Sequence, residues 1–225
     1  MRSAGLCPAA AVVIALALAG CSKNEGTPVP VGAGGAGANL RSDDDFVRDV
    51  AMKNLAETEL SRMAVDKSSS ADIKMFAQMM LDDHTAAGNN LKNAASGQPI
   101  EWPARLDDTH RKIADELAKK QGADFDREYI KAMIDGHQDF TAKLESRLDV
   151  QSVADWKTAA AGRTQGKALP EPKAALSDVA VRPAKSDNGT TMKINQWAAD
   201  TYPIAQKHLD TARALENAAK TRSTD

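Results

Sequence analysis

The stretch that decides the fold class of this chain is residues 70–96, SADIKMFAQMMLDDHTAAGNNLKNAAS. Its apolar side chains recur every three or four residues, which places them on one face of an α-helix: Phe76, Met80, Ala87 and Leu91. The polar residue His84 falls in the middle of that face. Ser70 is a good helix N-cap, and Gly97-Gln98-Pro99 ends the pattern. The stretch therefore predicts a long helix that buries one face.

The same period recurs on both sides of this stretch. It predicts further helices over about 43–67, 103–121, 124–148 and 191–220, with Pro203 kinking or dividing the last one. No strand pattern of convincing length occurs. We therefore predict an all-α fold over residues 43–220, a four-helix bundle with a shorter crossover helix. Residues 150–190 are expected to form a long irregular insertion before the last helix, because glycine and proline punctuate them.

The N-terminal residues resemble a bacterial lipoprotein signal peptide. Arg2 precedes an apolar segment, Ala9 to Leu18, that is too short to span a membrane. Leu18-Ala19-Gly20-Cys21 then resembles a lipoprotein box, in which small residues precede a cysteine that receives a diacylglycerol. We expect residues 1–20 to be removed and Cys21 to become the lipidated first residue, with an ordinary secretory signal as the alternative.

Residues 21–42 are rich in glycine and proline and are expected to form a flexible tether to the membrane. Ser22, rather than Asp, follows the cysteine. That choice is typical of sorting to the outer membrane of a Gram-negative cell, so we expect an outer-membrane lipoprotein facing the periplasm.

Composition excludes several function classes. The chain has 225 residues, a net charge of −2 with both signs interspersed, and only 4% aromatic residues. Without a basic patch or stacking aromatics, a nucleic-acid partner is not expected. The only cysteines are Cys7 in the signal peptide and Cys21, so the mature protein has no disulfide and no cysteine nucleophile. No nucleophile elbow and no phosphate-binding glycine loop occurs, which argues against hydrolase and nucleotide chemistry.

Four polar residues fall at mid-helix positions on faces that are otherwise apolar: Glu57, His84, His137 and His208. Mid-helix residues on the inward faces of a bundle share one level, so we expect these four to converge. A metal ion would neutralise the buried carboxylate and engage the imidazole lone pairs. This donor set suits Zn, Fe, Mn or Cu, and the sequence predicts one such ion. The alternative is a polar layer that fixes helix register without a ligand.

Two neighbouring patterns bear on this prediction. Met80 and Met133 each stand one turn before a histidine, a pairing found in copper sites, but methionine also fills cores and we favour that interpretation. Asp83 and Asp135 fall off the central faces. We expect them to face solvent or to support a ligand rather than to coordinate a metal.

Several blocks of sequence occur in a fixed order on these helices. They are Glu57-x-Glu59-Leu60, Phe76-Ala77-x-x-Met80-x-x-Asp83-His84, Phe125-Asp126-Arg127-x-Tyr129-Ile130, His137-Gln138 and Pro203-x-x-x-x-His208-Leu209. Over about residues 43–149 and 191–219 the chain thereby resembles domain of unknown function 4142. The resemblance implies a ferritin-like bundle in a bacterial envelope or secreted protein, and no defined activity.

The chain departs from the di-iron ferritins, whose sites use a Glu-x-x-His motif. Leu81 and Ile134 stand three residues before His84 and His137, so a di-iron ferroxidase site is not expected. The leading hypothesis is a non-enzymatic, lipid-anchored envelope protein that binds a metal ion or a small ligand in its bundle. The alternatives are a structural or interaction module without a ligand, and a metal-dependent oxidoreductase of ferritin-like descent. The sequence identifies no protein partner.

Overall fold

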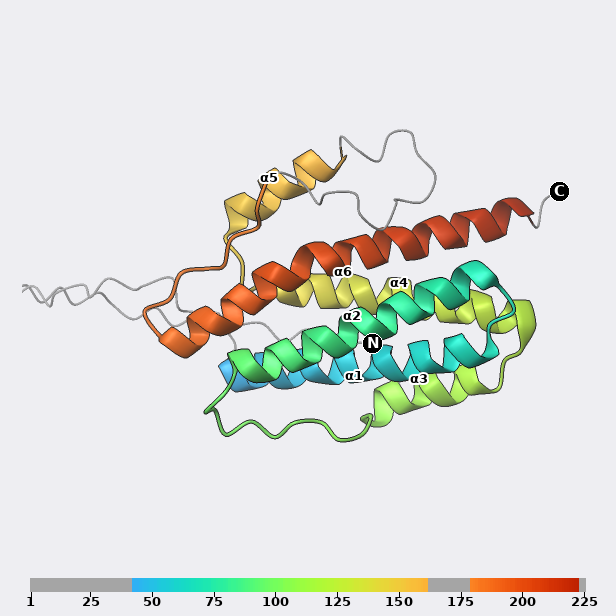
Figure 1. Ribbon diagram of the computed structural model, residues 1–225, viewed down its shortest axis with the longest axis horizontal. Coiled ribbons are helices and arrows are strands. Elements are labelled where there is room, and N and C mark those ends of the chain that lie inside the picture. The colour runs from blue at the N-terminus through green and yellow to red at the C-terminus, as the bar shows by residue number, and fades with distance from the viewer. Residues whose placement is uncertain (1–41, 162–178, 223–225) are drawn as a thin grey trace, which may run out of the picture. The chain divides into compact units, whose positions relative to one another are not determined.

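Polar side chains begin the first helices of this chain. In the computed structural model, Ser42 begins α1 (Asp43–Lys67) and Ser70 begins α2 (Ala71–Ala94), each accepting a hydrogen bond from a backbone N–H of the first turn. Asp107 caps α3 (Asp108–Ala118) in the same way, and α4 spans Gly122–Glu145. With α5 (Val150–Ala161) and α6 (Gly189–Arg222), the described residues, 42–161 and 179–222, contain six helices (Figure 1).

The described residues all belong to one unit of the chain, Asn39–Asp225. The predicted signal peptide, Cys21 and the tether lie outside the described residues, so the fold does not bear on them. Among the helices in the two described ranges, none combines the length and the apolar character that a membrane span requires.

The four long helices pack in a ring, in which α1 contacts α2 and α4, and α6 contacts the same two helices. A turn of three residues, 68–70, makes α1 and α2 antiparallel neighbours. The chain then crosses to α4 through residues 95–121, which include α3, and α3 lies against α1 and α4. The prediction of an all-α fold with a shorter crossover helix is confirmed.

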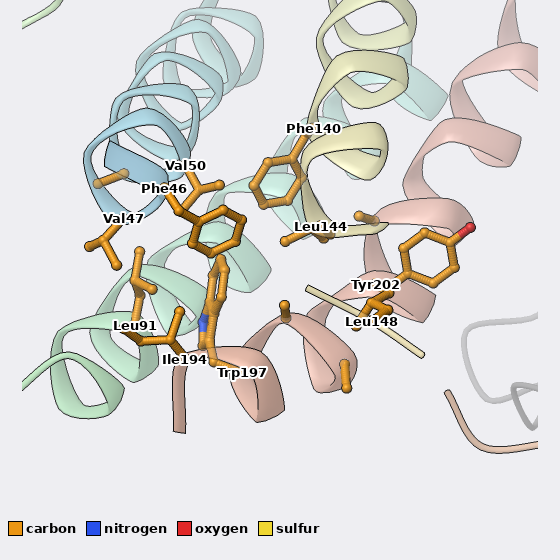
Figure 2. Close-up of a cluster of buried hydrophobic side chains, with 14 of the residues drawn as sticks. Phe46, Val47, Val50, Leu91, Phe140, Leu144, Leu148, Ile194, Trp197 and Tyr202 are labelled. Carbon is orange, nitrogen blue, oxygen red and sulfur yellow. The ribbon is translucent and has the colours of Figure 1, made fainter. Parts of the chain in front are cut away.

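Two clusters of buried apolar side chains fill the interior of this ring. The first includes Phe46 and Trp197, whose rings meet edge to face with centroids 6.3 Å apart, and Phe140 and Leu144 from α4 (Figure 2). The second lies further along the helices and includes Leu60, Phe76, Met80, Tyr129 and Met133. Met80 and Met133 therefore fill the core, the role that the sequence analysis favoured over copper binding.

A buried arginine fixes the ends of three helices relative to one another. Arg147, just after α4, is 1% exposed and lies over the Phe46 ring, 4.4 Å from its centroid. Its guanidinium pairs with Asp43, whose other carboxylate oxygen accepts a hydrogen bond of 2.7 Å from Thr191 of α6. Paired in this way, the buried charge holds α1, α4 and α6 in register.

The structure corrects the expectation for residues 150–190, because their first third is the helix α5. Asp149 caps it, accepting a hydrogen bond from the backbone N–H of Ser152. Val153 and Trp156 are buried, and the Trp156 ring packs edge to face on Tyr202 of α6. The glycines and prolines that suggested an irregular segment all follow Ala161.

Three further details of the helices correct or narrow what the sequence pattern predicts. The crossover helix begins at Asp108 rather than Pro103, because the Asp107 side chain caps it. Pro203 lies inside α6 without dividing it, which removes one of the two effects predicted for it, a division or a kink. Ile204 shares the apolar period of α6 but is 38% exposed.

Candidate metal centre

A polar layer separates the two apolar clusters. Its members are the four residues predicted from the sequence: Glu57 of α1, His84 of α2, His137 of α4 and His208 of α6. Each follows the apolar period of its own helix, so each is carried into the core with its neighbours. None is more than 4% exposed.

The four side chains lie within contact distance of one another. The ring centroids of the three histidines are 5.3 to 5.5 Å apart, and one nitrogen of each ring lies within 4.8 Å of the others. A Glu57 carboxylate oxygen, Oε2, lies 3.1 Å from His84 Nε2, and Oε1 lies 3.2 Å from His137 Nδ1. The structure therefore brings together all four predicted residues, and its three buried histidines could hold a metal ion.

Each histidine also contacts one polar group that is not a member of the layer. His84 Nδ1 lies 3.0 Å from the Asn54 amide oxygen, and His137 Nδ1 lies 3.0 Å from the Met133 carbonyl oxygen. His208 Nε2 lies 2.8 Å from the Asp83 carboxylate. Because all three partners are acceptors, the ring nitrogens that face them must donate a hydrogen bond. In a neutral ring the opposite nitrogen then carries a lone pair: His84 Nε2, His137 Nε2 and His208 Nδ1.

These lone pairs point into the middle of the layer, and none of the three rings directs an N–H group there. His137 Nε2 and His208 Nδ1 lie 3.3 Å apart, so that two acceptors face each other unless a proton or a metal ion lies between them. His84 Nε2 and both carboxylate oxygens of Glu57 make no hydrogen bond of good geometry with the described part of the chain, although His137 Nδ1 lies 3.2 Å from Oε1. A protonated Glu57 would donate its Oε2–H to His84 Nε2, 3.1 Å away, but His137 Nε2 and His208 Nδ1 would still face each other as two acceptors.

Burial shifts the charge states of the layer. Desolvation raises the pKa of Glu57 from 4.5 to about 8, and the charge of nearby Lys53 only partly opposes this. Desolvation, with the charge of His208 adding to it, lowers the pKa of His137 to about 3. It also holds the pKa of His84 well below its usual range, since an added charge on the ring would be buried beside two other histidines. Burial therefore favours the neutral rings of His84 and His137 beside a carboxyl group that resists ionisation.

The backbone leaves room for the Glu57 carboxylate at one point of α4. A Cβ atom added to Gly136 would lie 2.8 Å from Glu57 Oε1, closer than a real Cβ contact. Gly136 directly precedes His137, so α4 supplies both a histidine and the space beside it.

The remaining predicted residues lie outside the layer. Asp83 supports His208 from the outside, as expected, and Asp135 pairs with Lys131 at the surface. The fourth histidine, His110, pairs with Asp107 at the start of α3. The sequence pattern did not predict the contacts of Asn54 and of the Met133 carbonyl with the histidines. Asn54 lies three residues before Glu57 and so shares its helical face. That spacing could have indicated that Asn54 lies beside the layer.

Comparison with known proteins gives one match. The model of a family described as Domain of unknown function (DUF4142) matches residues 29–166, which include Glu57, His84 and His137 but not His208. No curated protein and no solved structure matches the chain. The ferritin-like descent expected from the sequence therefore stays a prediction.

Proposed function

The chain belongs to the family described as Domain of unknown function (DUF4142), and we propose that this member binds one transition-metal ion in the core of its helical bundle. The observation that carries the proposal is the set of converging acceptors without donors. One nitrogen of each of the three histidines lies within 4.8 Å of the others, Glu57 Oε2 lies 3.1 Å from His84 Nε2, and every one of these side chains is buried. A cation among these atoms would satisfy them together.

The distances in the layer agree with metal coordination. A tetrahedral zinc ion with ligands at about 2.0–2.1 Å holds neighbouring ligand atoms about 3.3–3.4 Å apart. His137 Nε2 and His208 Nδ1 are separated by 3.3 Å, and His84 Nε2 and Glu57 Oε2 by 3.1 Å. The set of three nitrogens and one oxygen suits Zn²⁺, Fe²⁺, Mn²⁺ or Cu²⁺.

The outward hydrogen bonds support the same function. Histidines that bind metals almost always donate their other ring N–H to a carboxylate, a carbonyl or water, which fixes the orientation of the ring. All three histidines have such a partner here: Asn54, the Met133 carbonyl and Asp83. A polar layer that only set helix register would instead need a proton between His137 Nε2 and His208 Nδ1, and both rings already direct an N–H outward, to the Met133 carbonyl and to Asp83.

Elemental analysis by mass spectrometry tests the proposal. The chain would be purified without a metal-affinity step, alongside the double variant His84→Ala/His137→Ala. About one metal ion per chain is expected in the wild type and none in the variant. Absence of metal in the wild type, even after incubation with Zn²⁺, Fe²⁺, Mn²⁺ and Cu²⁺, would refute metal binding and favour the structural alternative.

Asp83→Asn is expected to weaken zinc binding by about 10- to 100-fold without removing any ligand. The carboxylate holds the proton of His208 on Nε2 and so keeps Nδ1 free for the metal. Competition against a chelator of known affinity measures the change. Asp82→Asn is the matched control, because Asp82 is on the same helix and its carboxylate accepts a hydrogen bond from Gln78 at the surface. Equal affinities of the two variants would contradict a role for Asp83.

We further propose that the protein is a lipoprotein anchored through Cys21 in the bacterial envelope. The support is the sequence Leu18-Ala19-Gly20-Cys21 after a short apolar segment. Expression in a Gram-negative bacterium with an alkyne-bearing fatty acid is expected to label the wild type and Cys7→Ser, but not Cys21→Ser. Labelling that survives Cys21→Ser would rule out this anchor.

A further inference from the structure

A groove between α1, α3 and α4 lies against the Glu57 side of the candidate metal centre. It has a volume of about 570 Å³, and among the described residues that line it Glu57 is the only member of the polar layer. On the other side of the centre, a cleft between α2 and α6 is lined by His84 and His208. Two hollows therefore lie against the centre, and different ligands form part of the wall of each.

On the groove side, a single side chain spans the distance from the wall to the histidines. Glu57 lines the groove, yet its Oε2 lies 3.1 Å from His84 Nε2 and its Oε1 lies 3.2 Å from His137 Nδ1. Both carboxylate oxygens are buried, so the layer is closed in this conformation. Rotation of this one side chain into the groove would uncover the nitrogens behind it.

The hydrogen bonds of the two walls differ. On the cleft side, His84 is held by Asn54 at 3.0 Å and His208 by Asp83 at 2.8 Å, so turning either ring breaks a hydrogen bond. The Glu57 carboxylate makes no hydrogen bond of good geometry with the described part of the chain. Its movement between staggered rotamers therefore breaks fewer interactions than movement of either histidine.

The groove also has room for the carboxylate and no excess of positive charge. Gly136 lines it, and a Cβ atom at this position would lie 2.8 Å from Glu57 Oε1, so the absence of a side chain leaves the carboxylate its space. Besides Glu57, the carboxylates that line the groove match its lysines in number, and Asp135 and Asp139 each pair with one of those lysines. The balance of charge does not oppose the approach of a cation.

We propose that Glu57 is the mobile ligand of the centre: its carboxylate rotates into the groove between α1, α3 and α4, and the metal ion enters and leaves by that route while the three histidines stay in place. This inference rests on the proposed metal binding. An obstruction of the groove lies on the path of the ion and not in its bound state. It should therefore slow uptake and release by the same factor and leave the Kd unchanged.

The test uses the full chain and Co²⁺, whose visible absorption follows uptake on rapid mixing and release into excess EDTA. Thr109→Trp/Ile113→Trp places two rings, one turn apart, on the groove face of α3, and both positions are exposed, so this variant should fold. Both rates are expected to fall by about tenfold or more. Arg111→Trp/Asp115→Trp is the matched control, because it has the same spacing at exposed positions of α3 that do not line the groove, and it should exchange like the wild type.

Ala86→Trp, in the wall of the α2–α6 cleft, distinguishes the two sides of the centre and should also exchange like the wild type. If it slows exchange and Thr109→Trp/Ile113→Trp does not, the ion passes beside the histidines and the proposal is overturned. Wild-type rates in both variants overturn it equally, and so does a groove variant in which only release or only uptake changes; metal binding then still stands. Failure of the wild type to bind Co²⁺ or any other metal overturns metal binding itself.

Discussion

Zinc is expected to raise the melting temperature of the metal-free protein by about 5–10 °C when it is present at about one hundred times its Kd. A ligand at that excess stabilises the folded state by about 2.7 kcal/mol, because the unfolded chain does not hold the four ligands together. In this protein they come from four different helices, so unfolding destroys the site. Thermal unfolding followed by circular dichroism, with and without zinc, measures the shift.

Single substitutions of the histidines should remove that shift. His84→Ala and His137→Ala are expected to melt at nearly the same temperature with and without zinc, since three remaining ligands hold the ion far less well. His110→Ala is the matched control, because His110 lies on α3 and pairs with Asp107 outside the layer. If zinc stabilises His84→Ala as much as the wild type, the layer is not the zinc site.

The metal-free protein is expected to lose about 1 kcal/mol of stability between pH 7 and pH 8.5, and Glu57→Gln should abolish this loss. Burial raises the pKa of Glu57 to about 8, so the folded protein holds a proton that the unfolded chain releases near pH 4.5. A group whose pKa is raised by folding stabilises the protein at low pH, and this contribution disappears as the pH rises through the folded value. Denaturant unfolding at a series of pH values measures the slope.

His84 and His137 change the pH dependence of stability in the opposite direction, and they do so at lower pH. Folding lowers the pKa values of His84 and His137, so their contribution is present above about pH 6.5 and is lost as the pH falls. The window above pH 7 therefore isolates Glu57. Glu59→Gln, a partly exposed glutamate of the same helix, is the control. If the wild type and Glu57→Gln lose the same stability over this window, Glu57 is not the group that titrates there.

A bound metal ion should reverse the effect of the ionised Glu57 carboxylate on the stability of the protein. A bound cation neutralises the carboxylate, so the zinc-loaded wild type is expected to keep its stability up to pH 8.5. Glu57→Gln removes a charged ligand and should bind zinc more weakly than the wild type, although it is the more stable protein without metal. The same carboxylate thus destabilises the metal-free fold and stabilises the metal-bound one.

The helices could be predicted because their signals are local. Ser42 and Ser70 cap α1 and α2 at the predicted starts, since a cap depends only on the next three residues. The inward positions of Glu57, His84, His137 and His208 also followed from the period of each helix alone. The start of α3 differs from the prediction because Pro103 suits a first turn, whereas the Asp107 side chain caps the helix. The helix α5 was missed because it lies next to a segment rich in glycine and proline.

The sequence by itself determined an all-α fold and the four side chains that point into the core, because both depend on spacing within a single helix. Only the tertiary structure decided which ring nitrogens face one another and which face Asn54, Met133 and Asp83. It also decided that a cleft between α2 and α6 stops at His84 and His208, while Gly136 makes room for Glu57 on the other side. These features depend on the rotation and height of each helix relative to its neighbours, which the packing of both apolar clusters fixes and no single helical period encodes.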